Sequence, residues 1–189
     1  SSSWRAKRAL DVVASAGLIM LVSPILVGCA LAVKFTSRGP IFFRQVRVGL
    51  GGRPFEILKF RTMKVNDDSA TQWSVQGDDR VTSVGRFLRP SHLDELPQLF
   101  NVLRGDMSLV GPRPERPHFV EQFKEDINRY MSRHVSKPGM TGWAQVNGLR
   151  GNTDLRKRIE HDLWYLENWS ISLDFKILAR TFFNRDNAY

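Results

Sequence analysis

The sequence is poor in cysteine and in acidic residues. Cys29 is the only cysteine among 189 residues, and a single thiol forms neither a disulfide framework nor a zinc site. A reducing compartment fits this composition. The chain also lacks internal repeats and low-complexity segments. Its length and its 42% hydrophobic content therefore predict one globular domain with a single core.

Acidic residues are outnumbered by basic ones, 19 to 28, so the net charge is +9. Such an excess predicts a polyanionic partner: nucleic acid, anionic lipid or a phosphorylated substrate. The sequence has no helix-turn-helix, zinc-finger or RNP-type pattern, which argues against nucleic acid. A basic membrane-associated module that binds nucleic acid or lipid is the non-enzymatic alternative.

The longest apolar stretch, Ala9 to Val33, has Asp11 as its only charge. As one helix, about 25 residues would extend roughly 38 Å, more than the roughly 30 Å of the hydrocarbon core. Ser23 and Pro24 lie within the run, where proline removes a helical hydrogen bond and can break the helix. Each arm would then be too short to cross alone, and the Ser23 hydroxyl is a natural partner for a freed backbone group.

Both flanks of the apolar run are basic, with WRAKR before it and Lys34 and Arg38 after it. A spanning helix would place one basic flank outside the cell, whereas a re-entrant helix keeps both on the cytoplasmic face. We therefore predict a basic flank and a re-entrant helix-break-helix in residues 1–38, and a cytoplasmic domain in residues 39–189. A proline-kinked spanning helix is the alternative, and a wholly buried helix is disfavoured in so small a chain.

Two alternating segments around a glycine-rich turn, Ile41 to Val48 and Pro54 to Met63, predict a β-hairpin. The strand period places Lys59 and Arg61 on one face, as a candidate clamp for phosphates. A solvated cationic edge strand is the alternative. The polar stretch Asn66 to Asp79 predicts a mobile loop beside the site.

Two adjacent carboxylates, Asp94 and Glu95, lie close to arginines in the sequence. A carboxylate can bind Mg²⁺ together with substrate phosphates, or act as a nucleophile that forms an acyl-phosphate. Arg86 and Arg89 precede the pair and could neutralise phosphate oxygens. The pattern favours phosphoryl transfer over a glycosidase, whose two carboxyls must lie at least about 5 Å apart across a sugar.

A helix cap is the alternative role for Asp94, because Ser91 is placed as an N-cap with Asp94 at the third helical position. Capping explains neither Glu95 nor Pro97. A proline beyond the first turn costs about 3 kcal/mol and leaves the Leu93 carbonyl without its usual partner. A local cost of this kind indicates a functional site.

The C-terminal third is expected to be mainly helical. Apolar spacing predicts one helix from Pro117 to Val135 and two within Asp154 to Asn184, with a short strand at Ala144 to Val146. The stripe within Leu155 to Leu166 is predicted to face the core. The stripe within Leu173 to Phe183, beside basic residues, is predicted to lie on anionic membrane lipids. The expected fold class is α+β, with a small hairpin and interfacial amphipathic helices.

Three motifs, in this order, resemble the bacterial sugar transferases, which are monotopic polyprenyl-phosphate phosphoglycosyl transferases. They are KFRTM at Lys59–Met63, the stretch from Arg86 to Pro114 and KPGMTGWAQVNG at Lys137–Gly148. The second motif includes the spaced Arg86 and Arg89 and the run DELPQLFNVLRGDMSLVGPRP. Essentially the whole chain resembles the catalytic domain of the undecaprenyl-phosphate glucose phosphotransferases of exopolysaccharide assembly. Those enzymes carry further N-terminal membrane helices, so we expect this chain to be a truncation. The resemblance implies a monotopic protein of the bacterial inner membrane.

The resemblance also implies a two-step reaction. Asp94 would attack the β-phosphate of a UDP-sugar, expected to be UDP-glucose with UDP-galactose as the alternative, and UMP would leave. Undecaprenyl phosphate would then accept the phosphosugar. Glu95 would either bind Mg²⁺ together with Asp94 or deprotonate the acceptor. Lys59, Arg89 and Arg113 would hold phosphates. A homodimer is compatible with the sequence.

Overall fold

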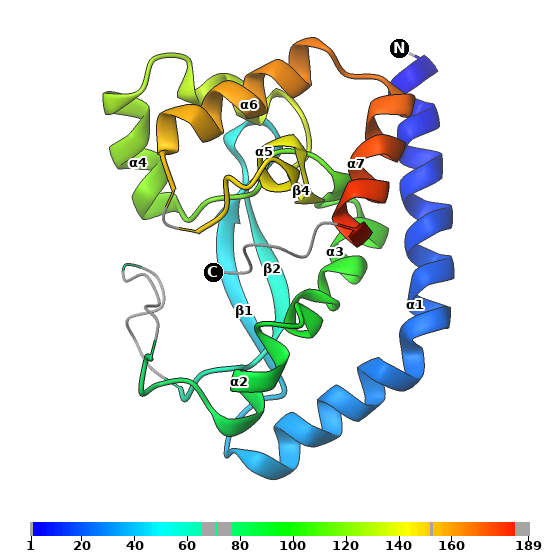
Figure 1. Cartoon of the computed structure of the whole chain (residues 1–189), viewed down its shortest axis with the longest axis vertical. Helices are drawn as coiled ribbons and strands as arrows, with labels where there is room; N and C mark the ends of the chain where they lie inside the picture. The colour runs from blue at the N-terminus through cyan, green and yellow to red at the C-terminus, as the bar shows by residue number, and fades with distance from the viewer. Residues whose placement is uncertain (1, 66–70, 72–76, 152, 184–189) are drawn as a thin grey trace.

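The computed structural model describes residues 2–65, 71, 77–151 and 153–183. Most of the predicted loop at Asn66 to Asp79 lies outside these residues. A long helix, α1 (Ser2–Thr36), runs along one side of a mixed α/β domain (Figure 1). The other helices are α2 (Ser83–Leu88), α3 (Gln98–Arg104), α4 (Pro117–Asp126), α5 (Trp143–Val146), α6 (Leu155–Glu167) and α7 (Ile171–Phe183). The strands are β1 (Phe42–Val48), β2 (Pro54–Phe60), β3 (Ser108–Val110) and β4 (Gly139–Thr141).

Helix α1 is continuous through Pro24, but Figure 1 shows that it bends sharply part-way along. Proline has no N–H to donate to the carbonyl four residues earlier, which belongs to Met20. The Ser23 hydroxyl donates to that carbonyl at 2.8 Å, as expected for the freed backbone group. The predicted break is therefore a bend. The two arms diverge at an open angle and do not fold back into a hairpin (Figure 1).

The two faces of α1 differ. Its inner face packs Leu18 and Val22 against the main core cluster. Its outer face exposes large apolar side chains, with Val13 72%, Leu21 75% and Phe35 82% accessible. By length and composition the helix could cross a membrane. It is not a wholly buried helix, in agreement with the sequence.

Buried charges attach the start of α1 to the domain. The Lys7 ammonium forms an ion pair with Asp174 of α7 and donates to the Val110 carbonyl at 3.1 Å. The Asp11 carboxylate accepts a hydrogen bond from the Leu109 amide at 3.0 Å. Because buried charges are stabilised only when paired and hydrogen-bonded, these contacts hold α1 against β3 and α7. Lys7 of the basic flank thus binds protein groups.

The predicted β-hairpin is confirmed. Strands β1 and β2 pair antiparallel, in a register from Phe42 opposite Phe60 to Val48 opposite Pro54. Gly51 and Gly52 in the turn have φ values of 65° and 76°, which glycine adopts without steric cost. Strands β3 and β4 form a second, parallel pair.

Two predictions in the C-terminal third are wrong. The helix predicted to run to Val135 ends at Asp126 and is followed by a separate 3-10 turn from Tyr130. Arg129 between them adopts a φ of 61°, a left-handed conformation that a right-handed helix cannot contain. The predicted strand at Ala144 to Val146 is the short helix α5, and the strand, β4, lies just before it.

The predicted core-facing stripe of α6 is confirmed, whereas the predicted lipid-facing stripe of α7 is found only in part. Ile159 of α6 is buried in a core cluster, with Leu155 and Leu163 packed against it. On α7, however, Ile177 is fully buried in the main core cluster, so the predicted lipid-facing stripe is largely a core stripe. The apolar side chains that α7 leaves exposed are Phe175, Phe182 and Phe183.

Candidate active site

A short 3-10 turn, Leu93–Glu95, carries the acidic pair. His92 precedes it with a φ of 56°, a left-handed conformation that is uncommon outside glycine. This conformation separates the turn from the end of α2. The Ser91 hydroxyl donates backwards, to the carbonyls of Phe87 and Leu88 at 2.9 and 3.1 Å. The prediction that Ser91 caps a helix containing Asp94 is therefore wrong.

Pro97 lies at the start of α3, as its N-cap residue. A proline costs little there, because the first helical N–H groups have no intrahelical acceptor. The Leu93 carbonyl accepts a hydrogen bond from the Leu96 amide at 3.3 Å. The predicted local cost at Pro97 is thus absent, and the two carboxylates lie in the junction between α2 and α3.

Glu95 is neutralised by two cations. Its Oε1 accepts from Lys59 Nζ at 2.7 Å and from Arg113 Nη2 at 2.8 Å. Burial alone would raise the pKa of this carboxyl, but the charges and hydrogen bonds of Arg113 and Lys59 hold it well below its usual value. Glu95 is therefore ionised across the physiological pH range. Its negative charge in turn raises the pKa of Arg113.

Asp94 has the opposite environment. Asp94 is 8% exposed, and within the described part of the chain its carboxylate makes no hydrogen bond or ion pair. Burial raises the pKa of Asp94 to about 6, an effect that outweighs the opposing charge of Lys59. One acid of the pair is thus tied to cations, and the other is a buried carboxyl left open to a further partner.

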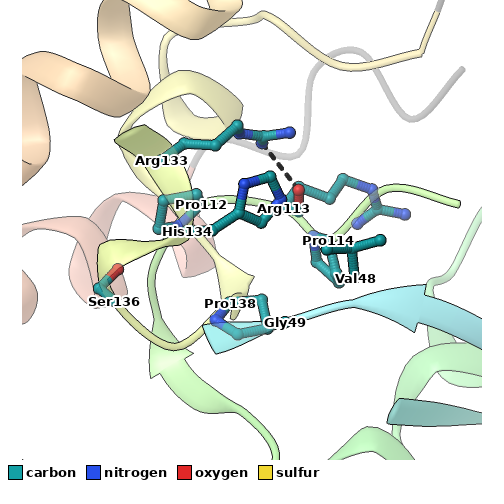
Figure 2. Close-up of a pocket in the computed structure, with 9 residues that line it drawn as sticks. All are labelled: Val48, Gly49, Pro112, Arg113, Pro114, Arg133, His134, Ser136 and Pro138. Atoms are coloured by element: carbon teal, nitrogen blue, oxygen red, sulfur yellow. Dashed lines mark hydrogen bonds between the residues drawn. The ribbon is translucent and has the colours of Figure 1, made fainter. Parts of the chain in front are cut away.

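Arg113 is held in place through its own backbone. Arg133, which forms a buried ion pair with Asp162 at 2.6 Å, donates to the Arg113 carbonyl at 2.8 Å (Figure 2). Figure 2 shows this contact beside a small pocket lined by Val48, Gly49, Pro112, Arg113, Pro114, Arg133, His134, Ser136 and Pro138. Arg47 donates to the neighbouring Pro114 carbonyl at 3.0 Å. A buried guanidinium, that of Arg133, and a partly buried one, that of Arg47, therefore fix this turn.

The GPRP and KPG motifs lie against each other, which explains their glycines. A Cβ on Gly139 would lie 2.0 Å from the Gly111 nitrogen, and a Cβ on Gly111 would lie 2.6 Å from the Lys137 carbonyl oxygen. Only glycine permits an approach this close. The third motif thus supports the turn that carries Arg113.

The remaining predicted phosphate-binding residues are placed differently from one another. Arg89, the C-cap of α2, is close enough to lower the pKa of Asp94 by its charge. Arg86 lies one turn earlier on α2 with an exposed side chain. Arg61 follows the end of β2 and donates to the carbonyls of Ser37 and Pro40. Lys59 and Arg61 therefore do not form the predicted side-by-side clamp, and Arg61 links β2 to the end of α1.

Sequence reasoning missed two residues at the site, His92 and Arg150. The guanidinium of half-buried Arg150 lies 3.5 Å from the His92 imidazole. Burial and the nearby charge of Arg113 lower the pKa of Arg150, while Glu95 opposes this. Among the residues that the structure describes, no carboxylate forms an ion pair with Arg150. Its position two residues beyond the third motif is the one signal that could have drawn attention to it.

A family model described as bacterial sugar transferase matches residues 2–185. The chain belongs to this family. The resemblance seen in the sequence is thus confirmed.

Several curated proteins are similar to this sugar transferase over nearly its whole length. Proteins named UDP-glucose:undecaprenyl-phosphate glucose-1-phosphate transferase from Klebsiella pneumoniae and Caulobacter vibrioides are 53% and 52% identical, over 94% and 97% of the chain. The chain covers 39% of the first and 72% of the second. A UDP-N-acetylgalactosamine-undecaprenyl-phosphate N-acetylgalactosaminephosphotransferase from Aeromonas hydrophila is 48% identical over 93% of the chain, which covers 42% of it.

The acidic pair of this sugar transferase has donor atoms that suit Mg²⁺. Asp94 is open to a cation, and Oε2 of Glu95 accepts no hydrogen bond from any described residue. No group of three His, Cys, Asp or Glu residues converges within the described ranges. Substrate phosphates and water would therefore complete the coordination shell, and Mg²⁺ is commonly bound in this way.

Proposed function

We propose that this chain transfers a sugar-1-phosphate from a UDP-sugar to undecaprenyl phosphate, through a covalent phosphosugar on Asp94 and with release of UMP. One observation carries the proposal: the asymmetry of the acidic pair. Glu95 is bound by two cations, whereas the buried Asp94 forms no ion pair among the described residues and has a pKa raised to about 6. A poorly solvated carboxylate that is ionised at neutral pH suits a nucleophile.

In the first step, an Asp94 carboxylate oxygen attacks the β-phosphorus, which bears the sugar. The bond between the β-phosphorus and the bridging oxygen breaks, and that oxygen leaves with UMP. In the second step, a phosphate oxygen of undecaprenyl phosphate attacks the same phosphorus and releases the Asp94 carboxylate. Arg113 and Arg150 would balance charge on the diphosphate. Mg²⁺ held at Asp94 and Glu95 would neutralise phosphate charge during transfer.

UDP-glucose is the expected donor. Relatives named as glucose-1-phosphate transferases are 49% to 53% identical to this chain, and a relative named for N-acetylgalactosamine is 48% identical. UDP-galactose remains the alternative inferred from the sequence. The product would begin the assembly of an exopolysaccharide or another glycoconjugate.

The membrane arrangement belongs to the same proposal. We place the exposed apolar face of α1 in the bacterial inner membrane, with both helix ends and the catalytic domain on the cytoplasmic side. The bend at Pro24 and the exposed apolar side chains of α1 support this monotopic, re-entrant arrangement. The exposed Phe182 and Phe183 near the end of α7 would contact the same anionic lipid surface.

Purified protein should be incubated with Mg²⁺ and, separately, with UDP-glucose, UDP-galactose and UDP-N-acetylgalactosamine. We expect UMP release with UDP-glucose before any acceptor is added, and an intact-mass increase of one phosphosugar. Addition of undecaprenyl phosphate should remove the adduct and give the lipid-linked product. Release of UDP, or transfer that requires both substrates together and leaves no adduct, would contradict the covalent mechanism.

Arg150→Ala is expected to raise the KM for the UDP-sugar by about 10- to 100-fold. A hydrogen bond to a charged group contributes about 1.5–3 kcal/mol, and Arg150 is a cation near the acidic pair with no carboxylate bound to it among the described residues. Initial rates of UMP release measure the effect. Arg44→Ala, which removes an exposed arginine of the hairpin, is the matched control and should leave the KM unchanged. Equal KM values for the two variants would remove Arg150 from the donor site.

A further inference from the structure

An apolar groove lies between the second arm of α1 and α2. It has a volume of about 410 Å³ and is lined by Gly28, Cys29, Ala32, Ser83, Val84, Phe87 and Leu88. The Ser83 hydroxyl and the Cys29 thiol are the only polar side-chain groups among these residues, and none of them is charged. A groove of this size and composition suits a hydrocarbon chain.

Small residues on α1 keep the groove open. Gly28 and Ala32 are one helical turn apart, so they lie on the same face of the helix. A Cβ placed on Gly28 would meet no atom within 4 Å. Cys29 and Leu88 are buried beneath the groove, while Phe87 is 68% exposed and remains accessible. The hollow is therefore an open space beside a packed layer, and a side chain added at position 28 would enter it without displacing the core.

The layer beneath the groove is directly connected to the active site. Cys29, Phe60 and Leu88 form one buried cluster, and Leu93 packs against it. Three of these residues immediately neighbour the site in sequence: Phe60 follows Lys59, Leu88 precedes Arg89, and Leu93 precedes Asp94. Each backbone segment thus sends one side chain into the apolar layer and the next toward the acidic pair.

We propose that this groove binds the part of the polyprenyl chain nearest the phosphate of the lipid acceptor. The inference rests on the proposed function and specifies where the acceptor lies. Its phosphate must reach Asp94, and the hydrocarbon attached to it must leave the site over an apolar surface. The groove supplies such a surface one residue from Arg89, because Leu88 lines it. Leu31 and Phe35, on the same arm of α1, are further exposed apolar side chains that the rest of the chain could follow into the bilayer.

A polyprenyl chain is a better occupant than the acyl chain of a bilayer phospholipid. The head group of a phospholipid would have to enter the arginine-rich site in order to place its chain in this groove, and it would then compete with both substrates. A polyprenyl phosphate gains binding free energy in both places at once, because its phosphate reacts in the arginine-rich site while its chain lies in the groove.

The test compares Gly28→Leu with Gly17→Leu. Gly17 is on the same helix, and a Cβ there also meets no atom within 4 Å, but it does not line the groove. Each variant is assayed for UMP release without acceptor, for transfer to undecaprenyl phosphate, and for transfer to a short, water-soluble prenyl phosphate. Phe87→Ala, at an exposed side chain of the groove, is a second variant that leaves the core intact.

We expect Gly28→Leu to raise the KM for undecaprenyl phosphate at least about tenfold, while UMP release without acceptor and use of the short acceptor stay at wild-type values. Phe87→Ala should raise the same KM, and Gly17→Leu should match the wild type. If Gly28→Leu and Gly17→Leu use undecaprenyl phosphate equally well, or if Gly28→Leu loses both acceptors equally, the groove does not bind the chain. Absence of UMP release by the wild type would instead contradict the proposed function.

Discussion

Asp94→Asn is expected to release UMP from a UDP-sugar at least about 1,000-fold more slowly than the wild type, and to be more stable. An amide is neutral and cannot serve as the attacking carboxylate, and loss of a nucleophile commonly costs several orders of magnitude in rate. The adduct detected by intact mass should be absent. A stopped UMP assay over hours would quantify the remaining rate, and retention of full activity would overturn the assignment of the nucleophile.

The gain in stability follows from the direction of the pKa shift. Burial raises the pKa of Asp94 from 3.8 to about 6, so between these values the folded protein binds more protons than the unfolded chain, and stability falls as pH rises. At pH 7 the ionised Asp94 is therefore destabilising, by roughly 2–3 kcal/mol at about 1.4 kcal/mol per pKa unit. Asparagine removes this charge. Chemical denaturation at pH 7 should show a higher midpoint for the variant.

The pH dependence supplies a separate control. The stability difference between Asp94→Asn and the wild type should be largest at pH 7 and should shrink as pH falls from about 6 toward 4, because the wild-type carboxyl becomes protonated. Wild-type UMP release should rise with pH through the same value, about 6, since the nucleophile must be ionised. A stability difference that grows toward low pH would contradict the environment described for Asp94.

Glu95→Gln is expected to have the opposite effect on stability, a loss of about 3 kcal/mol at pH 7. The glutamate accepts from two cations, Lys59 and Arg113, in a half-buried setting. Removal of one partner of a buried pair is strongly destabilising because the remaining charge is uncompensated. A glutamine oxygen still accepts a hydrogen bond but carries no charge, and here two cations would be left. The free energy of unfolding by urea measures the loss.

The pKa shift of Glu95 also fixes how this stability difference changes with pH. The folded-state pKa of Glu95 is held well below 4.5, so its contribution to stability is present above that value and is lost as pH falls through the folded-state pKa. The gap between the wild type and Glu95→Gln should therefore narrow in acid. Glu56→Gln is the matched control, because Glu56 makes an exposed ion pair with Arg44 at 3.8 Å, worth at most about 1 kcal/mol. Equal losses for the two variants would show that Glu95 is not held as described.

Local patterns predicted the hairpin and the acidic pair well, because each depends on residues close together in the chain. The alternation around Gly49 to Gly52 specifies two strands whatever packs on them. Asp94 and Glu95 stood out because no single helix cap uses both acids. In contrast, Ser91 and Pro97 were assigned to a helix that does not form, since the left-handed His92 begins a separate turn. The spacing of apolar residues does not reveal a single positive φ such as that of His92.

Long-range contacts account for the other differences. Arg61 and Lys59 are two residues apart, yet one binds carbonyls at the end of α1 and the other binds Glu95. Strand period could not separate them, because the strand ends at Phe60. Arg150 reaches the site from a segment more than fifty residues beyond the acidic pair, and nothing in its local sequence distinguishes it from other arginines. Such partners emerge only when the packing of β3, β4 and α5 is known.

The buried contacts of Lys7 and Asp11 tie the position of α1 to the position of the acidic pair. These charges bind β3 and α7, and Cys29 and Val33 pack the second arm into the cluster that Leu93 contacts, so both arms of α1 are attached to the domain. From Asp11 to Pro24 the helix rises about 20 Å at about 1.5 Å per residue. In the proposed membrane arrangement, this length and the attachment of both arms would together set how far Asp94 stands from the plane of the lipid phosphates.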